Sequence, residues 1–304
     1  RCVYESGIRT VGLMLVLLSF FMSMLLTNDV TLVTMIPFTL LMFERISGEK
    51  KARAEIFLLV LETAAANLGS MLTPMGNPQN LYLYSKFDLS MAEFLGIIFP
   101  YSALSLILLI FSVFAFLPKL KTEQSKGSEK IQGKFKLILF ILLFVANMLT
   151  ILRILDEKIL LEIVAAAVLV TDRKLFLKAD YSLLLTFVFF FVFVGNMGAI
   201  PALSDKLQSI LSGNEVGISV LLSQVISNVP AAILLSGLSD NGSALIIGTN
   251  LGGLGTLIAS MASLITYKFY AGSQNSSPKK YILVFTAYNV CCLAVLLGLY
   301  FIFR

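Results

Sequence analysis

The sequence predicts an all-α, polytopic membrane protein. Of the 304 residues, 58% are hydrophobic and only 13% are charged, with a mean hydropathy of +0.90, whereas a soluble domain carries about 25% charged residues. Apolar runs recur along the whole chain and are too long and too continuous for barrel strands. Polar interruptions inside several runs predict helices that break at membrane depth.

Composition excludes several classes of function. The chain contains no histidine, which rules out His-based zinc sites, Ser-His-Asp triads and histidine proton relays. Its three cysteines lack metal-ligand spacing. The net charge of +5 comes from basic residues in loops between apolar runs, so we expect no nucleic-acid partner. We expect no cofactor except a coupling ion, Na+ or H+.

The first apolar runs predict a re-entrant hairpin. Residues 10–26 and 30–43 are apolar and flank Thr27, Asn28 and Asp29. The second run covers about 21 Å, which is short of a hydrocarbon core of about 30 Å. We therefore expect a hairpin with these three residues at its tip, with two short tilted spans as the alternative.

A helix that begins near residue 55 breaks at residues 73–80. Pro74 and Pro78 each remove a backbone donor, and Gly76 permits backbone angles that other residues avoid. This stretch also carries polar side chains that could face a solute: Thr73, Asn77 and Asn80. A full span at 93–117 completes the first half, residues 1–117.

A long basic linker, residues 118–134, separates the halves, and residues 135–304 form the second half. The second half opens with three apolar segments and one polar surface helix: 135–151, 159–171, 181–200 and 201–215. Residues 216–238 then carry Ser227-Asn228-Val229-Pro230 at their centre, and each arm covers about 15 Å. Neither arm can span a bilayer, so this segment predicts a second re-entrant hairpin.

The second broken helix covers residues 244–270. Its predicted break is Thr249-Asn250-Leu251-Gly252-Gly253, and a final span follows at 281–303. If residue 1 faces the cytoplasm and each hairpin returns to its own side, eighteen of the 23 Lys and Arg residues lie inside. We therefore expect an inner or plasma membrane protein with a cytoplasmic linker.

The two halves predict inverted repeats. Each has a hairpin with an Asn-centred tip and then a broken helix, and the hairpins open to opposite sides, an arrangement that places a binding site near the midplane. The spacing differs, since Asn28 to Asn77 is 49 residues and Asn228 to Asn250 is 22. Three apolar segments precede the second hairpin and none precede the first. We therefore expect a fragment that lacks N-terminal helices, with a naturally short protein as the alternative.

Four segments resemble the ion transporter superfamily, and most closely its citrate-transporter-like branch. They are residues 26–30, 73–80, 227–232 and 249–253, of which Gly76-Asn77-Pro78-Gln79-Asn80 is the most specific. The superfamily includes citrate and dicarboxylate carriers, arsenite/antimonite permeases and sodium–proton antiporters. The resemblance implies two cation sites and one substrate site, formed by the hairpin tips and helix breaks. It also implies a homodimer with an elevator-like moving domain. The first tip, Thr27-Asn28-Asp29, differs from the Ser-Asn-Thr of dicarboxylate carriers.

Helix ends inside the membrane leave unpaired amides, which attract anions, and unpaired carbonyls, which attract cations. The candidate substrate- and ion-binding residues are Thr27, Asn28, Asp29, Thr73, Gly76, Asn77, Asn80, Ser227, Asn228, Thr249, Asn250 and Gly252. Within this set the candidate Na+ ligands are Asn28, Gly76, Asn77, Asn228 and Asn250. The alternative is that these residues only cap helices and allow close helix packing.

Two acidic residues occur in apolar surroundings. Asp29 is the carboxylate at a hairpin tip, and we hypothesise that it binds the coupling cation or proton. The alternative is that Asp29 caps its helix arm. For Glu62, in the first broken helix, we consider either a basic partner near the cytoplasmic end or a role in proton movement.

The sequence thus predicts a secondary active transporter of a small anion or oxyanion, such as citrate or a dicarboxylate, coupled to Na+ or H+. An arsenite/antimonite permease or an Na+/H+ antiporter is the alternative. A channel or an intramembrane enzyme belongs to a different class. The lack of histidine and of paired carboxylates argues against an enzyme. The expected partners are the small anion, the lipid bilayer and a second copy of the chain.

Overall fold

The computed structural model describes residues 7–44, 51–118, 134–152, 154–171, 173–178, 208–273 and 276–303, with isolated positions between 181 and 200. The described residues are helical with connecting turns and include no β-strand. Most of the predicted linker, the predicted segment 181–200 and the start of the predicted surface helix lie outside them. The chain divides into two compact units, residues 1–124 with 190–304, and residues 125–189.

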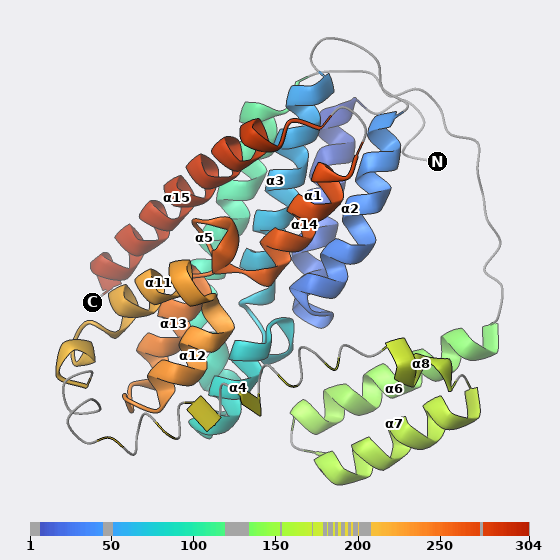
Figure 1. Cartoon of the computed structure of the whole chain (residues 1–304), viewed down its shortest axis with the longest axis vertical. Helices are drawn as coiled ribbons and strands as arrows, with labels where there is room; N and C mark the ends of the chain where they lie inside the picture. Colours follow the sequence, from blue (N-terminus) through green and yellow to red (C-terminus); the bar gives the residue numbers. More distant parts are fainter. Residues whose placement is uncertain are drawn as a thin grey trace. The chain divides into compact units, whose positions relative to one another are not determined.

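The smaller unit contains three described helices. α6 (Lys134–Ile151) packs against α7 (Glu157–Thr171), and α8 (Lys174–Lys178) follows. Figure 1 shows α6 and α7 as a pair. The predicted helices 135–151 and 159–171 are therefore confirmed. Apolar side chains such as Leu161 stay exposed, as expected for a surface that faces lipid.

The larger unit begins with a helical hairpin. α1 (Ile8–Leu25) and α2 (Asn28–Glu44) pack against each other and against α3 (Lys51–Ser70). After a break come the short helix η1 (Pro74–Gly76), α4 (Pro78–Lys86) and α5 (Met91–Phe116). These bounds confirm the predicted order of elements in the first half.

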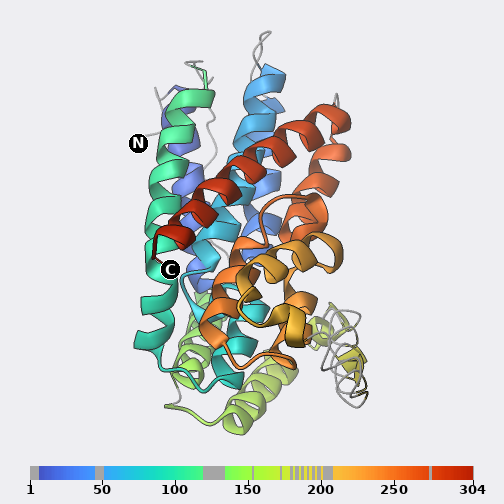
Figure 2. The ribbon, with the colours of Figure 1, turned by 90° about the vertical axis from the view of Figure 1, so that its left-hand side faces the viewer.

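The rest of the larger unit repeats this order. α11 (Glu215–Ile226) and α12 (Asn228–Ser236) form the second hairpin. α13 (Gly242–Leu251), η2 (Leu257–Ala259) and α14 (Met261–Ala271) form the second broken helix, and α15 (Pro278–Phe303) ends the chain. α15 packs against α5, which it crosses in Figure 2.

The second break lies later than predicted. Thr249 and Asn250 belong to the last turn of α13, and the break extends from Gly252 to Ser260, with the short helix η2 inside it. The Asn-Leu-Gly-Gly pattern indicates a helix end, but α13 still completes its turn at Leu251 before the chain leaves the helix.

The packing of the two halves is reciprocal. α2 of the first hairpin packs on α14 of the second half, and α12 of the second hairpin packs on α4 of the first half. Figure 1 shows α1, α2, α3 and α14 side by side, with α4, α12 and α13 grouped at the opposite end of this unit. Residues 21–29 and 221–229 also share the same order of exposed, half-buried and buried positions. This reciprocal packing and the shared burial pattern fit an internal repeat. The inversion of the repeat across the membrane stays a prediction.

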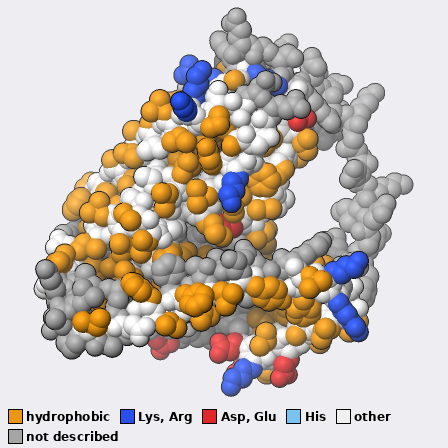
Figure 3. Space-filling model, viewed as in Figure 1, with side chains coloured by type: hydrophobic (Ala, Val, Ile, Leu, Met, Phe, Trp, Pro, Cys, Tyr) orange, Lys and Arg blue, Asp and Glu red, His pale blue; other side chains and the backbone are white. Residues whose placement is uncertain are grey.

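Three described helices are long and apolar enough to cross a membrane: Ile8–Leu25, Met91–Phe116 and Pro278–Phe303. Figure 3 shows this face of the larger unit covered mostly by hydrophobic side chains. α11 and α12 have 12 and 9 residues, or about 18 and 14 Å. Neither crosses a core of about 30 Å alone, which favours re-entrance as an interpretation.

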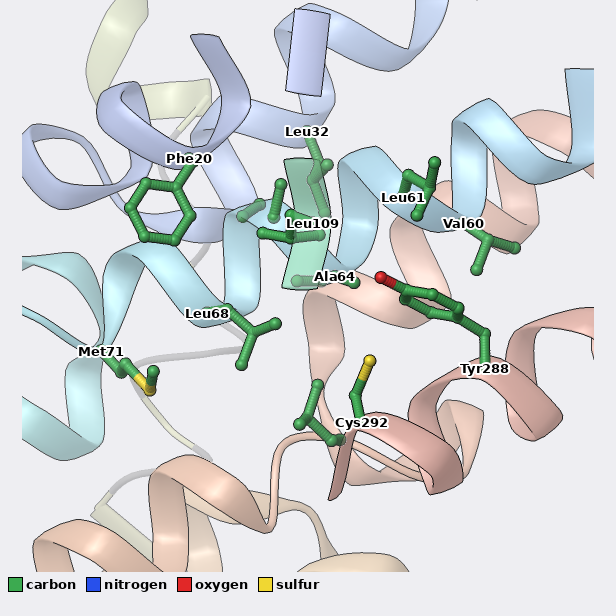
Figure 4. Close-up of a cluster of buried hydrophobic side chains, with 14 of the residues drawn as sticks. Phe20, Leu32, Val60, Leu61, Ala64, Leu68, Met71, Leu109, Tyr288 and Cys292 are labelled. Atoms are coloured by element: carbon green, nitrogen blue, oxygen red, sulfur yellow. The ribbon is translucent and has the colours of Figure 1, made fainter. Parts of the chain in front are cut away.

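α3 lies at the centre of the larger unit. Its side chains are buried from Leu58 to Ser70, and Figure 4 shows apolar side chains of α1, α2, α5 and α15 converging on it. The packing is close, because a Cβ on Gly69 would collide with the backbone oxygen of Phe20 in α1. Any polar side chain between Leu58 and Ser70 is therefore buried within protein.

Candidate functional site

The first hairpin tip is held by its own polar side chains. Thr27 Oγ1 accepts the backbone N–H of Val30 at 3.3 Å, and Asn28 Oδ1 accepts the N–H of Asp29 at 2.9 Å. Within the described structure the buried Asp29 Oδ1 has no hydrogen-bond partner. Thr27 thus fills the capping role considered for Asp29, and the Asp29 carboxylate remains a candidate ligand.

The first break is closed by side chains from both its ends. Thr73 Oγ1 donates to the backbone oxygen of Met24, next to the hairpin tip, and accepts the N–H of Gly76 at 3.2 Å. Gly76 is required here, because a Cβ would collide with the backbone oxygen of Ser70. Asn77 Nδ2 donates to Ser70 Oγ at 2.8 Å. The break is therefore a fixed structure that joins the tip to the end of α3.

Asn80 lies in the first turn of α4 and faces back toward the end of α3. Its Nδ2 lies near the backbone oxygens of Ser70, Met71 and Thr73, at 3.4, 3.2 and 3.2 Å. The Ser70 carbonyl is one that the terminated helix α3 leaves without an intrahelical partner, and Met71 and Thr73 lie in the break that follows. Asn80 therefore serves as a polar partner for the broken end.

The second tip contacts the second break in the same manner. Gln224 Nε2 donates to the backbone oxygens of Gly252 and Leu254, both at 2.9 Å, and Gln224 Oε1 accepts the N–H of Thr256 at 2.9 Å. Ser227 Oγ donates to the backbone oxygen of Ala259 at 3.4 Å.

Ser227 has φ 73° and ψ 157°, which is a strained conformation for a residue with a Cβ. Asn228 follows it and is buried. The second tip is therefore a constrained turn next to the second break.

The two breaks meet through asparagine side chains. Asn250 Nδ2 donates to Asn80 Oδ1 at 2.6 Å. Asn67 Oδ1 accepts bonds from Asn28 Nδ2 at 2.9 Å and from Ser260 Oγ at 3.0 Å, and Asn67 Nδ2 approaches Ser263 Oγ at 3.4 Å. The first hairpin tip, both broken helices and the start of α14 thus share one buried network.

These contacts define the register between the halves. Asn77 and Ser260 both precede a helix with nearly equal backbone angles, φ −145° and −142°, ψ 144° and 137°. On this register Asn67 is equivalent to Asn250. The equivalent of Asn77 is thus Ser260. The spacings of 49 and 22 residues differed in part because they were measured to Asn77 and to Asn250, which are not equivalent residues.

The same register pairs the contacts across the halves. Asn67 of the first half contacts Ser263 of the second half. The equivalent residue of the second half, Asn250, bonds Asn80 of the first half, and Asn80 is the equivalent of Ser263. Each half therefore contributes an asparagine near the end of its first helix segment and a partner from the start of its second.

Several members of this network were not predicted from the sequence. They are Asn67, Ser70, Gln224, Ser260 and Ser263. Asn67 lies inside a continuous apolar helix, where a single asparagine carries little signal. Alignment of the two halves on Thr73 and Thr256 would have pointed to it.

Two predicted residues have local roles in the structure. Thr249 Oγ1 donates to the backbone oxygen of Leu245 in its own helix at 2.7 Å. A Cβ on Gly252 would lie 2.5 Å from Ser223 Oγ, so this glycine lets α11 and α13 approach closely. Gly252 still contributes its backbone oxygen to the Gln224 contact.

Some buried polar atoms near the breaks have no partner in the described structure. They are Asn77 Oδ1, Asn250 Oδ1, Gln79 Oε1 and Gln79 Nε2. Buried polar groups are normally paired, so these atoms suit a polar solute or a cation. No group of three His, Cys, Asp or Glu side chains that could hold a metal ion occurs among the described residues. The oxygens that these atoms offer to a cation are neutral amide oxygens.

Comparison with known proteins places the chain in a family. Residues 4–241 match the family model described as citrate transporter. An uncharacterized transporter of Methanocaldococcus jannaschii is 38% identical over 263 residues, 85% of this chain and 70% of that protein. The inner membrane protein YbiR of Escherichia coli is 32% identical over 263 residues, 86% of this chain and 69% of that protein.

A shorter match is to part of the silicon efflux transporter LSI3 of Oryza sativa subsp. japonica. It is 41% identical over 78 residues, 26% of this chain and 15% of that protein. Together with the apolar helices of the fold, these matches support the resemblance proposed from the sequence. The chain belongs to the citrate transporter family and is a multi-pass membrane transporter.

Proposed function

We propose that this protein is a secondary active transporter of a small anion or oxyanion, with citrate as the first candidate, driven by a gradient of Na+ or H+. The observation that carries the proposal is the Asn80–Asn250 bond, which joins the two helix breaks inside the protein. A carrier needs one solute site that both halves can reach, and this bond brings the two interrupted helices together.

The helix starts around this point suit an anion. α2 and α12 begin at the hairpin tips, and α4 and α14 begin at the breaks. The amides of a helix N-terminus carry partial positive charge and bind carboxylate or oxyanion groups. The proposed substrate ligands at these starts are Thr27, Asn28, Thr73, Asn80, Ser227 and Asn228.

The broken ends of α3 and α13 suit a small cation. Their carbonyl groups, with the amide oxygens of nearby asparagines, are the neutral oxygen ligands that replace the hydration shell of Na+. The unpaired Asn77 Oδ1 and Asn250 Oδ1 support this assignment. The proposed Na+ ligands remain Asn28, Gly76, Asn77, Asn228 and Asn250, with Asp29 as a further ion or proton ligand.

The remaining expectations follow from the resemblance and are part of the proposal. The hairpin-bearing part would move relative to a static partner surface in a homodimer, in the manner of an elevator. The protein would lie in the inner or plasma membrane, with residues 118–134 in the cytoplasm. We propose no enzymatic activity and no organic cofactor.

The test is solute flux in proteoliposomes, with Na+ and pH gradients imposed separately. We expect citrate uptake that depends on one of the two gradients and is at least tenfold lower in Asn250→Ala. Uptake of arsenite instead would favour a permease, and proton efflux driven by Na+ alone would favour an antiporter. Gradient-independent flux far above carrier turnover would indicate a channel and contradict the proposal.

A further inference from the structure

Glu62 is a fully buried carboxyl group that the proposed site does not use. It lies in α3, eleven residues after Lys51 and five before Asn67, and its side chain has no exposed surface. Thr39 Oγ1 of α2 donates to Glu62 Oε1 at 2.9 Å, and Glu62 Oε2 has no hydrogen-bond partner in the described structure. The basic partner considered from the sequence is therefore replaced by a threonine.

The surroundings of Glu62 hold no compensating cation within the described part of the chain. Among the described residues, the hydrogen bond from the Thr39 hydroxyl is the one polar contact of the carboxyl group. The buried titratable groups on helices packed against α3 are Tyr101 of α5, Tyr270 of α14, and Tyr281, Tyr288 and Cys292 of α15. None of them is a cation, and the Tyr281 phenol is the one that interacts with Glu62. An unpaired carboxylate is strongly unfavourable in such a place. Glu62 therefore has to bind a proton or a cation.

The neighbouring groups favour the proton. Thr63 Oγ1 donates to the backbone oxygen of Leu59 and lies 2.9 Å from Thr266 Oγ1 in α14. Both threonine side chains are completely buried, so their oxygens are engaged within the packed core. A Na+ ion needs a shell of several free oxygens, whereas a proton needs only Oε2. The buried Tyr281 phenol is a second ionisable group that interacts with Glu62.

A cavity of about 130 Å³ is lined in part by Glu44, Lys51 and Glu55. The Tyr270 ring of α14 stacks on the Tyr281 ring of α15, with centroids 5.0 Å apart. The Lys51 end of α3 is therefore the side from which the proposal has a proton reach Glu62.

We propose that Glu62 is the proton-binding site of this transporter, separate from the solute site, and that its occupancy is transmitted through Thr39. A proton from water adds to Glu62 Oε2 and returns to water when the site opens. α2 carries both Thr39 and the tip residue Asn28, which binds Asn67 on α3. The charge on Glu62 thereby changes a contact of the same helix that forms the first tip. This inference rests on the proposed function and assigns its coupling ion as H+.

Infrared spectroscopy of the protein in lipid tests the site without requiring transport. We expect a C=O band from a protonated carboxyl group that grows as the pH is lowered. The band should be lost in Glu62→Gln and should persist in Asp29→Asn. In Thr39→Val it should shift to higher frequency. Removal of the band by Na+ at constant pH would make Glu62 a cation site and overturn the proposal. A band unaffected by both Glu62→Gln and Thr39→Val would also overturn it.

A transport assay is the second test of the proposal. Citrate uptake driven by a pH gradient should fall at least tenfold in Glu62→Gln. It should persist in Glu93→Gln, which keeps the capping box of α5 and changes an exposed carboxyl group. Uptake by Glu62→Gln that still follows the pH gradient would refute the coupling role. If the wild type moves none of the tested solutes, the proposed function fails, while the spectroscopic result still decides whether Glu62 binds a proton.

Discussion

Replacement of Asn67 by alanine should destabilise the protein more than loss of any single hydrogen bond. Asn67 bonds Asn28 and Ser260 and approaches Ser263, so three contacts between helices disappear at once. Such bonds in membrane proteins are worth about 0.6 kcal/mol on average and up to about 1.7 kcal/mol. Three of them give a loss of about 2 kcal/mol, with an upper value of about 5 kcal/mol.

Asn289→Ala is the matched control. Asn289 is also buried, but among the described residues its side chain bonds only the backbone oxygen of Phe285 in its own helix, at 2.9 Å. Both substitutions remove the same atoms, so the cavity contribution is similar. We expect Asn289→Ala to cost less than about 1 kcal/mol.

The assay is reversible unfolding in mixed micelles, followed by circular dichroism. An Asn28→Ala and Asn67→Ala double-mutant cycle should give a coupling of about 0.6 to 1.7 kcal/mol. Equal losses in Asn67→Ala and Asn289→Ala, or no coupling with Asn28, would refute the inference that Asn67 joins the first tip to both broken helices.

Four further substitutions test individual features of the breaks and tips. Gly76→Ala should prevent correct closure of the first break and lower the folded yield, because its Cβ collides with backbone; Gly96→Ala, with open space around it, is the control in a size-exclusion assay. Ser227→Gly should raise stability by about 1–3 kcal/mol in thermal unfolding by relieving the positive φ, and unchanged stability would show that the turn is unstrained. Thr27→Val should cost about 0.5–2 kcal/mol as a lost helix cap, and no loss would contradict the assigned Val30 bond. Gly248→Leu should separate α11 from α13 and lower the melting temperature, because a side chain at this position would collide with Ser219 and Val216 of α11.

Local signals were sufficient to predict the elements of the larger unit. The tip residues Thr27 and Asn28 interrupt apolar runs, and Pro74 and Pro78 flank the first break, so the polar or proline residues mark these boundaries directly. The second break lacks proline, and its start was placed too early because Asn250 and Gly252 suggest an end that α13 reaches only after Leu251.

Tertiary contacts account for what the sequence could not show. Asn67 lies in a helix of uniform apolar character and becomes a network centre only when α2 and α14 pack on it. Asp29 was weighed as a helix cap, but Thr27 takes that position. The partner of Glu62 also depends on which residue of α2 faces α3, and that register is set by packing rather than by sequence pattern.

The central claim, that both hairpin tips serve one solute, is tested most directly by substrate protection of single cysteines. In a background without native cysteines, Thr27→Cys and Ser227→Cys should react with a small charged thiol reagent, because both positions are partly exposed. Citrate, or the anion that the flux assay identifies, should slow both reactions at the same concentration and leave exposed Ser243→Cys unaffected. Protection of only one tip, or equal protection of Ser243→Cys, would contradict the shared site.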